Sequence, residues 1–287
     1  MDRQIDGLIS VILSVYNEPL EWVKLSVDSI LNQTYPKLEL IIIIDDPNNK
    51  PVIDFLKETK KRNQNIILLQ NKKNLGLVES LNKGLTYAQG EYVARMDADD
   101  ISDINRFLKQ LEFLNERNVD LCGTNYVCFS DDNTIIYHSR LCINQKGIIR
   151  NLRLGSGGMA HPTWLGRRSV FTELNGYRNI DACEDLDFLT RAILKGFKVG
   201  NRKEELLKYR NNDFSISHKK ETKQLTTAYL ISKAFRNSKI LDINDYEKII
   251  NKKSLNKIEI ILYRIIIKIV LRISFELDKI DSGNIYG

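Results

Sequence analysis

The chain has 287 residues, of which 43% are hydrophobic and 28% charged, a composition that is typical of a folded globular protein and excludes general disorder. Four cysteines without C-x-x-C spacing and three scattered histidines exclude a disulfide framework and a zinc site; with no signal peptide at the N-terminus, a cytosolic protein with reduced thiols is expected. The net charge of +6 originates in residues 201–287, which favours a local anionic partner over a nucleic-acid surface.

The first hundred residues alternate between apolar runs and segments with helical periodicity. The run at 38–44 is apolar apart from Glu39 and is dominated by isoleucine, as in a strand of a parallel sheet that is covered on both faces. Strands are predicted at 8–15, 38–44, 65–70 and 91–96, and helices at 20–31, 51–61 and 77–88. This alternation predicts an open α/β sheet.

Polar, largely acidic residues follow three of these strands. They occur at 14–18, at Asp45-Asp46 and at Asp97-Ala98-Asp99-Asp100. Open α/β sheets bind ligands at the carboxyl ends of their strands, so the three clusters are expected on one edge. An Asp-x-Asp at a strand tip suits a hard divalent cation that is held against a diphosphate. A single acidic turn is compatible with a solvated loop, whereas three clusters on one edge predict a site.

The second half of the sequence is more irregular. The sequence contains no G-x-x-x-x-G-K-[ST] phosphate loop, and residues 155–160 match a dinucleotide-binding G-x-G-x-x-[GA] pattern without the buried strand that should precede it. Residues 161–165 are expected to be extended. A helix is expected from about 184 to 195, with Glu184 and Asp185 in its first turn, where the helix dipole also stabilises acidic side chains.

Residues 7–215 resemble glycosyltransferase family 2, the inverting, metal-dependent sugar-nucleotide transferases with a GT-A fold. The motifs occur in the family's order at 14–18, 29–34, Asp45, 74–77, 81–84, 90–100 and Glu184-Asp185 with Arg191. His161-Pro162-Thr163, Gly176-Tyr177, Tyr209-Arg210 and Ser215-Ile216-Ser217 are most similar to bacterial members that build capsules, exopolysaccharides or lipopolysaccharide.

The resemblance implies a division of the chain. A GT-A catalytic domain, a Rossmann-like open mixed sheet flanked by helices, is expected at 1–215. Its residues 1–100 would form a nucleotide-binding half and 101–215 an acceptor half. A helical C-terminal extension is expected at 216–287.

The resemblance also implies roles for single residues. Nucleotide-sugar contacts are expected from Ser14, Tyr16, Asn17, Glu18, Asp45, Asn74 and Asp97. Many members of the family have Asp-Asp-Gly-Ser after the second strand, where this chain has Asp45-Asp46-Pro47-Asn48. Counting forward from Glu39 aligns Asp45 with the second aspartate of that family motif. By resemblance, Asp45 is therefore the residue expected to contact uracil. Asp99 is expected to be the main ligand of Mn²⁺ or Mg²⁺, with Asp97 sharing the metal through water or meeting the ribose, and Asp100 supporting Asp99.

The catalytic pair in this resemblance is Asp185, as the general base for the acceptor hydroxyl, and Glu184, which orients it or touches the acceptor. His161 and Arg191 are expected on the acceptor side. Structural interpretations remain open for several residues: Tyr16 is compatible with the core, Asn17 with a turn before Pro19, and His161 with a buried structural histidine. Arg191 is expected to orient Glu184 or Asp187 rather than to contact phosphate.

The C-terminal segment 255–280 has the pattern of a basic amphipathic helix. On a helical wheel its basic residues share one arc and isoleucine, leucine and valine fill most of the rest; the basic residues are Lys257, Arg264, Lys268, Arg272 and Lys279. These charges disfavour a transmembrane helix. Binding to an anionic membrane surface is expected, with packing on the catalytic domain or homodimer formation as the alternatives.

The expected activity is metal-dependent, inverting transfer of a hexosyl or N-acetylhexosaminyl group (EC 2.4) from a UDP-sugar to a hydroxyl of a saccharide acceptor. By resemblance the acceptor is lipid-linked and the enzyme is peripheral on the inner face of a bacterial membrane, without a nucleic-acid partner. A sugar nucleotidyltransferase is disfavoured because 15–18 is not a Gly-rich basic loop. A non-catalytic scaffold is disfavoured because Asp97, Asp99 and Asp185 are all present.

Overall fold

The computed structural model describes residues 4–180, 182–211 and 221–252, together with positions 265, 269, 272, 276 and 277. Its strands are β1 (Ile5–Val15), β2 (Leu38–Ile44), β3 (Ile66–Gln70), β4 (Gly90–Asp97), β5 (Ile101–Ser102), β6 (Leu121–Phe129), β7 (Ile135–His138), β8 (Leu165–Arg167) and β9 (Val199–Arg210). Its helices are α1 (Leu20–Leu31), α2 (Lys50–Arg62), α3 (Leu77–Tyr87), α4 (Arg106–Arg117), α5 (Gln145–Leu152), the 3₁₀ turn η1 (His161–Thr163), α6 (Arg168–Glu173), α7 (Glu184–Leu194), α9 (Glu221–Arg236) and α10 (Ile243–Lys252).

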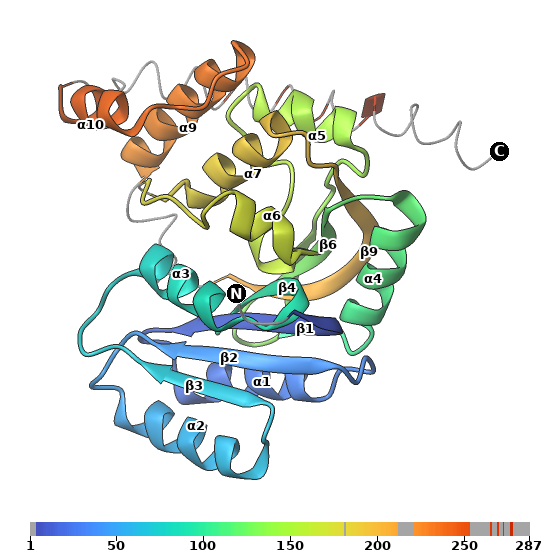
Figure 1. The fold of residues 1–287 in the computed structure, drawn as a ribbon, viewed down its shortest axis with the longest axis vertical. Coiled ribbons are helices and arrows are strands. Elements are labelled where there is room, and N and C mark those ends of the chain that lie inside the picture. Colours follow the sequence, from blue (N-terminus) through green and yellow to red (C-terminus); the bar gives the residue numbers. More distant parts are fainter. Residues whose placement is uncertain are drawn as a thin grey trace.

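The strands form one mixed sheet in the order β3-β2-β1-β4-β8-β6-β9-β5, with β7 paired to β6 (Figure 1). The first four strands in that order are parallel, as the strand–helix alternation predicts. β8 then runs antiparallel to both β4 and β6. The two halves of the chain that are expected to bind nucleotide and acceptor therefore share a single sheet, which confirms an open mixed sheet flanked by helices.

The isoleucine run of β2 shows why the sheet is covered on both faces. Leu40, Ile42 and Ile44 pack into a core with α1, α2 and α4. Ile41 and Ile43 point to the opposite face and pack into a second core that includes residues of α3, α5, α6 and α7. Successive side chains of a strand alternate between faces, so a continuously apolar strand supplies both cores.

Several residues of the family motifs fix packing rather than chemistry. A side chain at Gly84 of α3 would meet the Ile12 side chain of β1 at 2.6 Å, so glycine permits α3 to approach the sheet. The Asn82 amide donates to the Tyr177 carbonyl at 2.9 Å and accepts from the Tyr177 N–H at 2.8 Å. Gly176, at φ +68°, makes the turn that brings Tyr177 to Asn82.

One local prediction differs from the structure. Residues 161–163 form the 3₁₀ turn η1 instead of an extended segment, and only Leu165–Arg167 form a strand. The Thr163 hydroxyl donates to the Ala160 carbonyl at 2.7 Å, and the Trp164 N–H donates to the His161 carbonyl at 3.1 Å. Pro162 lies in the first turn of this short helix, a position where proline has no hydrogen bond to lose.

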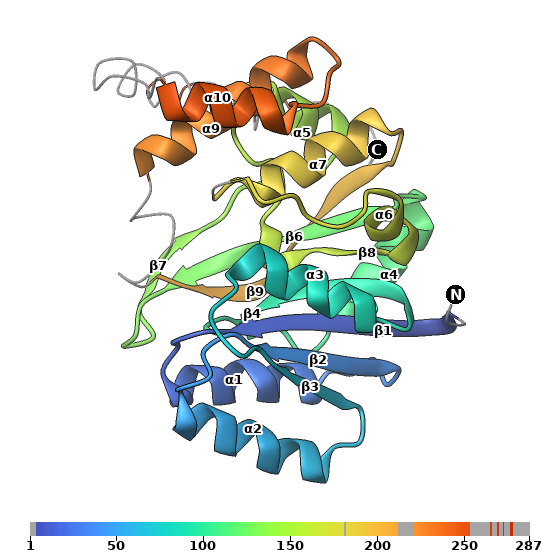
Figure 2. The ribbon, with the colours of Figure 1, turned by 60° about the vertical axis from the view of Figure 1, so that its left-hand side comes forward.

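Beyond the sheet, α9 and α10 cover α7 at the end of the molecule opposite α2 (Figure 2). Ala228, Ile231 and Phe235 of α9 and Tyr246 of α10 are buried in the same core as α7. Most of the predicted basic helix at 255–280 lies outside the described residues. At the positions described there, Ile265 and Ile269 are exposed. No helix among the described residues is long and apolar enough to cross a bilayer.

Candidate active site

The carboxyl ends of the central strands meet at one edge of the sheet, as predicted. In the register of the parallel strands, Ser14 at the end of β1 lies opposite Asp97 at the end of β4. Val15 lies opposite Ile44 on the other side of β1, and the Asp45 N–H donates to the Val15 carbonyl at 2.7 Å. Three polar clusters that are distant in sequence are thus neighbours.

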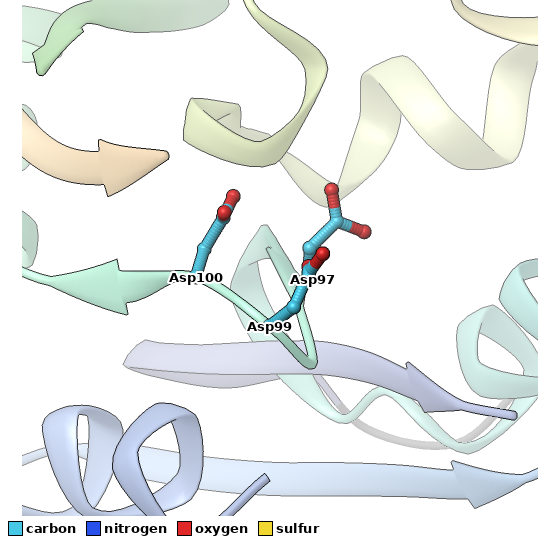
Figure 3. A group of neighbouring side chains, drawn as sticks. All are labelled: Asp97, Asp99 and Asp100. Atoms are coloured by element: carbon cyan, nitrogen blue, oxygen red, sulfur yellow. The ribbon is translucent and has the colours of Figure 1, made fainter. Parts of the chain in front are cut away.

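Asp97, Asp99 and Asp100 form a compact group of carboxylates on the turn after β4. One carboxylate oxygen of each lies within 4.8 Å of one oxygen of the others, and Figure 3 shows the three side chains on the same side of the turn. Asp100 is fully buried; its Oδ1 accepts from the Arg210 N–H at 2.9 Å, while its Oδ2 is buried without a hydrogen bond in the described structure. Oxygen donors in this arrangement fit a hard divalent cation.

The crowding of these carboxylates shows in their electrostatics. Burial, together with the charges of Asp97 and Glu18, raises the pKa of Asp99 to about 7. Burial and the charges of Asp99 and Asp97 raise the pKa of Asp100 well above its ordinary value. Carboxylates that repel each other in this way are stabilised by a cation between them, which is the physical reason to expect a metal here.

Residues of the 29–34 motif hold the turn that carries the acidic group. The Ser29 hydroxyl accepts from the Ser102 N–H at 3.0 Å, and the Gln33 amide donates to the Asp103 carbonyl at 2.6 Å. On the other side, Arg210 Nε donates to the Asp99 carbonyl at 2.9 Å. The acidic turn is therefore fixed from α1 and from β9.

Asp45 is buried, with 2% of its surface exposed, and shapes the neighbouring loop. Its Oδ1 accepts from the Asn71 amide at 2.7 Å and from the Leu75 N–H at 2.8 Å; its Oδ2 accepts from the Gly76 N–H at 2.8 Å. A carboxylate oxygen can accept two hydrogen bonds, so Oδ2 keeps room for one further donor.

The remaining residues expected to bind nucleotide surround this edge. Tyr16 is 43% exposed, so it is available for stacking and is not a core residue. Asn17 and Asn74 are exposed, and Asn74 Oδ1 accepts from the Gly76 N–H at 2.8 Å. The Glu18 carboxylate accepts from the Tyr16 N–H at 2.7 Å, and burial and the Asp97 charge raise the pKa of Glu18.

Glu184 and Asp185 lie in the first turn of α7, in the other half of the chain. Burial, with the charges of Asp185 and Asp97, raises the pKa of Glu184 to about 7. Burial raises the pKa of Asp185, although the Leu186 N–H donates to its Oδ1 at 2.7 Å.

His161 and Arg191, expected on the acceptor side, are buried in the structure. His161 is 7% exposed, its Nε2 lies 3.0 Å from the Tyr177 hydroxyl, and its ring lies 4.7 Å from that of Trp164. Burial lowers its pKa well below the ordinary value. Arg191 Nε donates to Asp187 Oδ2 at 2.8 Å, and its other nitrogens donate to backbone carbonyls. Of the two carboxylates proposed as its partner, the structure pairs Arg191 with Asp187.

Two arginines that sequence reasoning missed contact the acidic group directly. Arg95 of β4 is 5% exposed and forms an ion pair with Asp97. Arg210, at the end of β9, binds Asp99 and Asp100 through its side chain and backbone. For Arg95 the available signal was an arginine inside an apolar strand, two residues before Asp97, because residues i and i+2 of a strand share a face. For Arg210 it was the Tyr209-Arg210 motif, to which no role at the site was assigned.

The comparison with protein families identifies the chain. The model of the family "Glycosyl transferase family 2" matches residues 10–174, which is more than half of the chain. The chain is 33% identical over 243 residues to the uncharacterized glycosyltransferase MJ1057 of Methanocaldococcus jannaschii, covering 83% of each. It is 29% identical over 237 residues to the O-antigen biosynthesis glycosyltransferase WbnJ of Escherichia coli, covering 80% of this chain and 87% of WbnJ.

Solved structures share the fold at lower identity. TarS of S. aureus, in complex with UDP-GlcNAc, superposes with a TM-score of 0.58 at 19% identity, over 73% of this chain and 60% of that one. The mannosyltransferase PcManGT of Pyrobaculum calidifontis, in complex with GDP-Man and Mn²⁺, superposes with a TM-score of 0.62 at 15% identity, over 96% of this chain and 75% of that one. The chain therefore belongs to glycosyl transferase family 2 and is a glycosyltransferase with the GT-A fold.

Proposed function

We propose that this protein transfers a sugar from a UDP-sugar to a hydroxyl of a saccharide acceptor, with Mn²⁺ or Mg²⁺ and with inversion at the anomeric carbon. The observation that carries the proposal is the group of three carboxylates whose oxygens lie within 4.8 Å of one another, at the edge where β1 and β2 also end. Asp97, Asp99 and Asp100 follow β4, whereas Glu184 and Asp185 begin α7, and the Asp97 charge acts on Glu184. A donor diphosphate at the first group would place its sugar toward the second.

The nucleotide is held by the ends of β1 and β2. Exposed Tyr16 stacks on the base, and Asp45 Oδ2 accepts from the uracil N–H in addition to the Gly76 N–H. Ser14, Asn17, Glu18 and Asn74 line the same edge and bind the nucleotide. A UDP donor is favoured over a GDP donor because uracil offers one N–H between two carbonyls, which suits the one free acceptor position on Asp45, whereas guanine presents an N–H and an amino group side by side. The choice of uracil over thymine rests on the family resemblance. UDP-GlcNAc is the ligand of the structural relative TarS.

The acidic group holds the metal. Asp99 is the main ligand, Asp97 shares the ion or meets the ribose, and buried Asp100 supports the turn from behind. When bound, the divalent ion neutralises charge that develops on the departing diphosphate. Mn²⁺ accompanies GDP-Man in the structural relative PcManGT.

Asp185 accepts the proton of the acceptor hydroxyl as that oxygen attacks the anomeric carbon. Its raised pKa keeps it basic enough for this task, and Glu184 beside it orients the acceptor. Direct attack from the side opposite the diphosphate inverts the anomeric centre. A glycosidase would need a second carboxyl as proton donor, whereas here the diphosphate is the leaving group.

The acceptor belongs to surface polysaccharide synthesis, as the name of WbnJ indicates for that relative. By the resemblance stated above, such acceptors are lipid-linked, which accounts for a peripheral position on the inner face of the membrane through the basic segment 255–280. The acceptor lies against residues of 101–215. His161 supports this side from within the core, through the Tyr177 hydroxyl.

A thermal-shift screen of UDP-, GDP- and dTDP-sugars with Mn²⁺ tests the donor. A ligand that binds only the folded protein raises its apparent stability, so UDP-sugars should raise the melting temperature and the others should not. A larger shift with GDP-sugars would refute the UDP assignment. Release of UDP distinguishes the enzyme from a scaffold, and release of pyrophosphate from UTP and a sugar phosphate would instead indicate a nucleotidyltransferase.

A further inference from the structure

Arg95 is a buried arginine that contacts the acidic group from within β4. It lies on β4, two residues before Asp97, with 5% of its surface exposed, and its guanidinium pairs with Asp97 Oδ2. Its Nε is buried and has no hydrogen-bond partner in the described part of the chain. A buried arginine normally satisfies its donors with several acceptors, so this guanidinium is held by charge more than by hydrogen bonds.

The backbone of Arg95 is fixed on one side of its strand. Its N–H donates to the Trp164 carbonyl at 2.9 Å, and its carbonyl accepts from Arg106 Nη2 at 2.8 Å. The Arg95 side chain therefore starts from a backbone position that is held in place.

The charge of Arg95 reaches both groups. It lowers the pKa of Asp99 and Asp100 on one side and of Glu184 and Asp185 on the other, in each case against the larger effect of burial. His161 feels the same charge, which lowers its pKa in addition to burial. Arg95 therefore lies among the acidic turn, α7 and η1.

We propose that Arg95 is a positioning residue of the transfer reaction: through their ion pair it orients the Asp97 carboxylate beside Asp99 and Asp100. This inference rests on the proposed function, since it assigns Arg95 to the same site. A partner that orients a metal-binding carboxylate affects metal affinity or activity by about 10- to 100-fold.

Arg202 of β9 provides a control. Its guanidinium pairs with Glu204 at 2.8 Å and donates to the Lys109 carbonyl at 2.6 Å, so these contacts involve no carboxylate of the acidic group. Arg202→Met should lower the melting temperature without changing Mn²⁺ binding. A purely structural role for Arg95 would give the same result.

The test measures Mn²⁺ binding by calorimetric titration in the presence of UDP, and Mn²⁺-dependent UDP release from UDP-glucose and UDP-GlcNAc. Arg95→Met should weaken Mn²⁺ binding by about tenfold or more, because the Asp97 carboxylate loses the ion pair that orients it. The Mn²⁺ concentration for half-maximal rate should rise by the same factor.

Arg95→Lys separates charge from geometry, and it covers the case in which Arg95→Met does not fold. Lysine keeps the positive charge, but Mn²⁺ binding should stay weakened because the ammonium lacks the planar fork of the guanidinium. Wild-type Mn²⁺ binding by a folded Arg95 variant would overturn the inference. No UDP release by the wild type would instead refute the proposed function.

Discussion

Arg210 donates its backbone N–H to the buried Asp100 carboxylate at 2.9 Å, although 110 positions separate them in the sequence. The Arg210 guanidinium lies 4.7 Å from the centre of the Trp22 ring and 4.6 Å from that of Phe129. It also pairs with Asp131 at 3.0 Å. The last residue of β9 therefore fixes the acidic turn after β4 and connects it to α1 and β6.

Replacement of Arg210 by alanine should lower the free energy of unfolding by about 2 kcal/mol or more, because two cation–π contacts and the bond to the Asp99 carbonyl are lost. It should also weaken Mn²⁺ binding, since the turn loses its support. Denaturant unfolding and Mn²⁺ titration measure both effects. Asp131→Asn is the control: Asp131 is exposed, and loss of that pair should cost about 1 kcal/mol at most. Equal effects of the two substitutions would contradict this interpretation.

Asp99→Ala should abolish Mn²⁺-dependent UDP binding and leave the fold intact, because Asp99 lies on a turn that accommodates a smaller side chain. Calorimetric titration of UDP with and without Mn²⁺ is the measurement, with circular dichroism as the check on folding. Asp54→Ala, an exposed acidic residue of α2, should bind like wild type. Undiminished Mn²⁺-dependent binding by Asp99→Ala would remove Asp99 from the metal site.

Asp185→Asn should keep donor affinity and reduce transfer by a factor of about 10² to 10⁴, the range for a general base. Asparagine retains the size of the side chain and can still accept a hydrogen bond from the Leu186 N–H. Binding of UDP-sugar and the rate of UDP release must be measured on the same variant. If affinity falls in parallel with rate, Asp185 belongs to the donor site.

The pH dependence of stability should reveal the acidic group. A carboxyl with a raised pKa binds protons more readily in the folded than in the unfolded protein. The metal-free protein therefore gains stability as the pH falls from the pKa of the folded state toward that of the unfolded state. For Asp99 this pH range begins at about 7 and extends downward. In EDTA, wild type should therefore gain more stability than Asp99→Asn between pH 8 and pH 5. Mn²⁺ should stabilise wild type more at pH 8 than at pH 6. Identical pH profiles for the two proteins would contradict the raised pKa.

The basic segment 255–280 should bind anionic membranes. Each lysine or arginine near such a surface contributes about 1 kcal/mol, and the isoleucine-rich side inserts shallowly. Removal of residues 255–287 should release the protein from phosphatidylglycerol-containing liposomes and preserve UDP release. Unfolding after the truncation would indicate packing on the catalytic domain, and a halved molecular mass would indicate a dimer. Equal sedimentation of both forms with liposomes would reject the membrane assignment.

The sequence predicts the parallel half of the fold well because its signals are local. Residues 40–44 of β2 are apolar at every position, and this predicts a strand with two covered faces. The convergence of Asp45 and Asp97 follows from the same logic, since parallel strands present their ends on one edge. The sequence of the second half of the sheet, from β5 to β9, shows no comparable pattern.

The contacts that tune the site depend on distant partners and could not be predicted. His161 is packed against Trp164 and Tyr177, and sequence spacing cannot distinguish that environment from an acceptor site. Asp187 is buried between Arg178 and Arg191, although its position in the first turn of α7 is equally typical of an exposed acidic residue. Burial of charge is decided by tertiary packing, which no local pattern records.

The central claim is metal-dependent use of a UDP-sugar by the two carboxylate groups together. It is tested most directly by UDP release from a panel of UDP-sugars, measured for wild type, Asp99→Ala and Asp185→Asn in Mn²⁺ and in EDTA. The account predicts release by wild type in Mn²⁺ with at least one UDP-sugar, none in EDTA, and loss of release in both variants. Release that persists in EDTA, or at the wild-type rate in both folded variants, would contradict it.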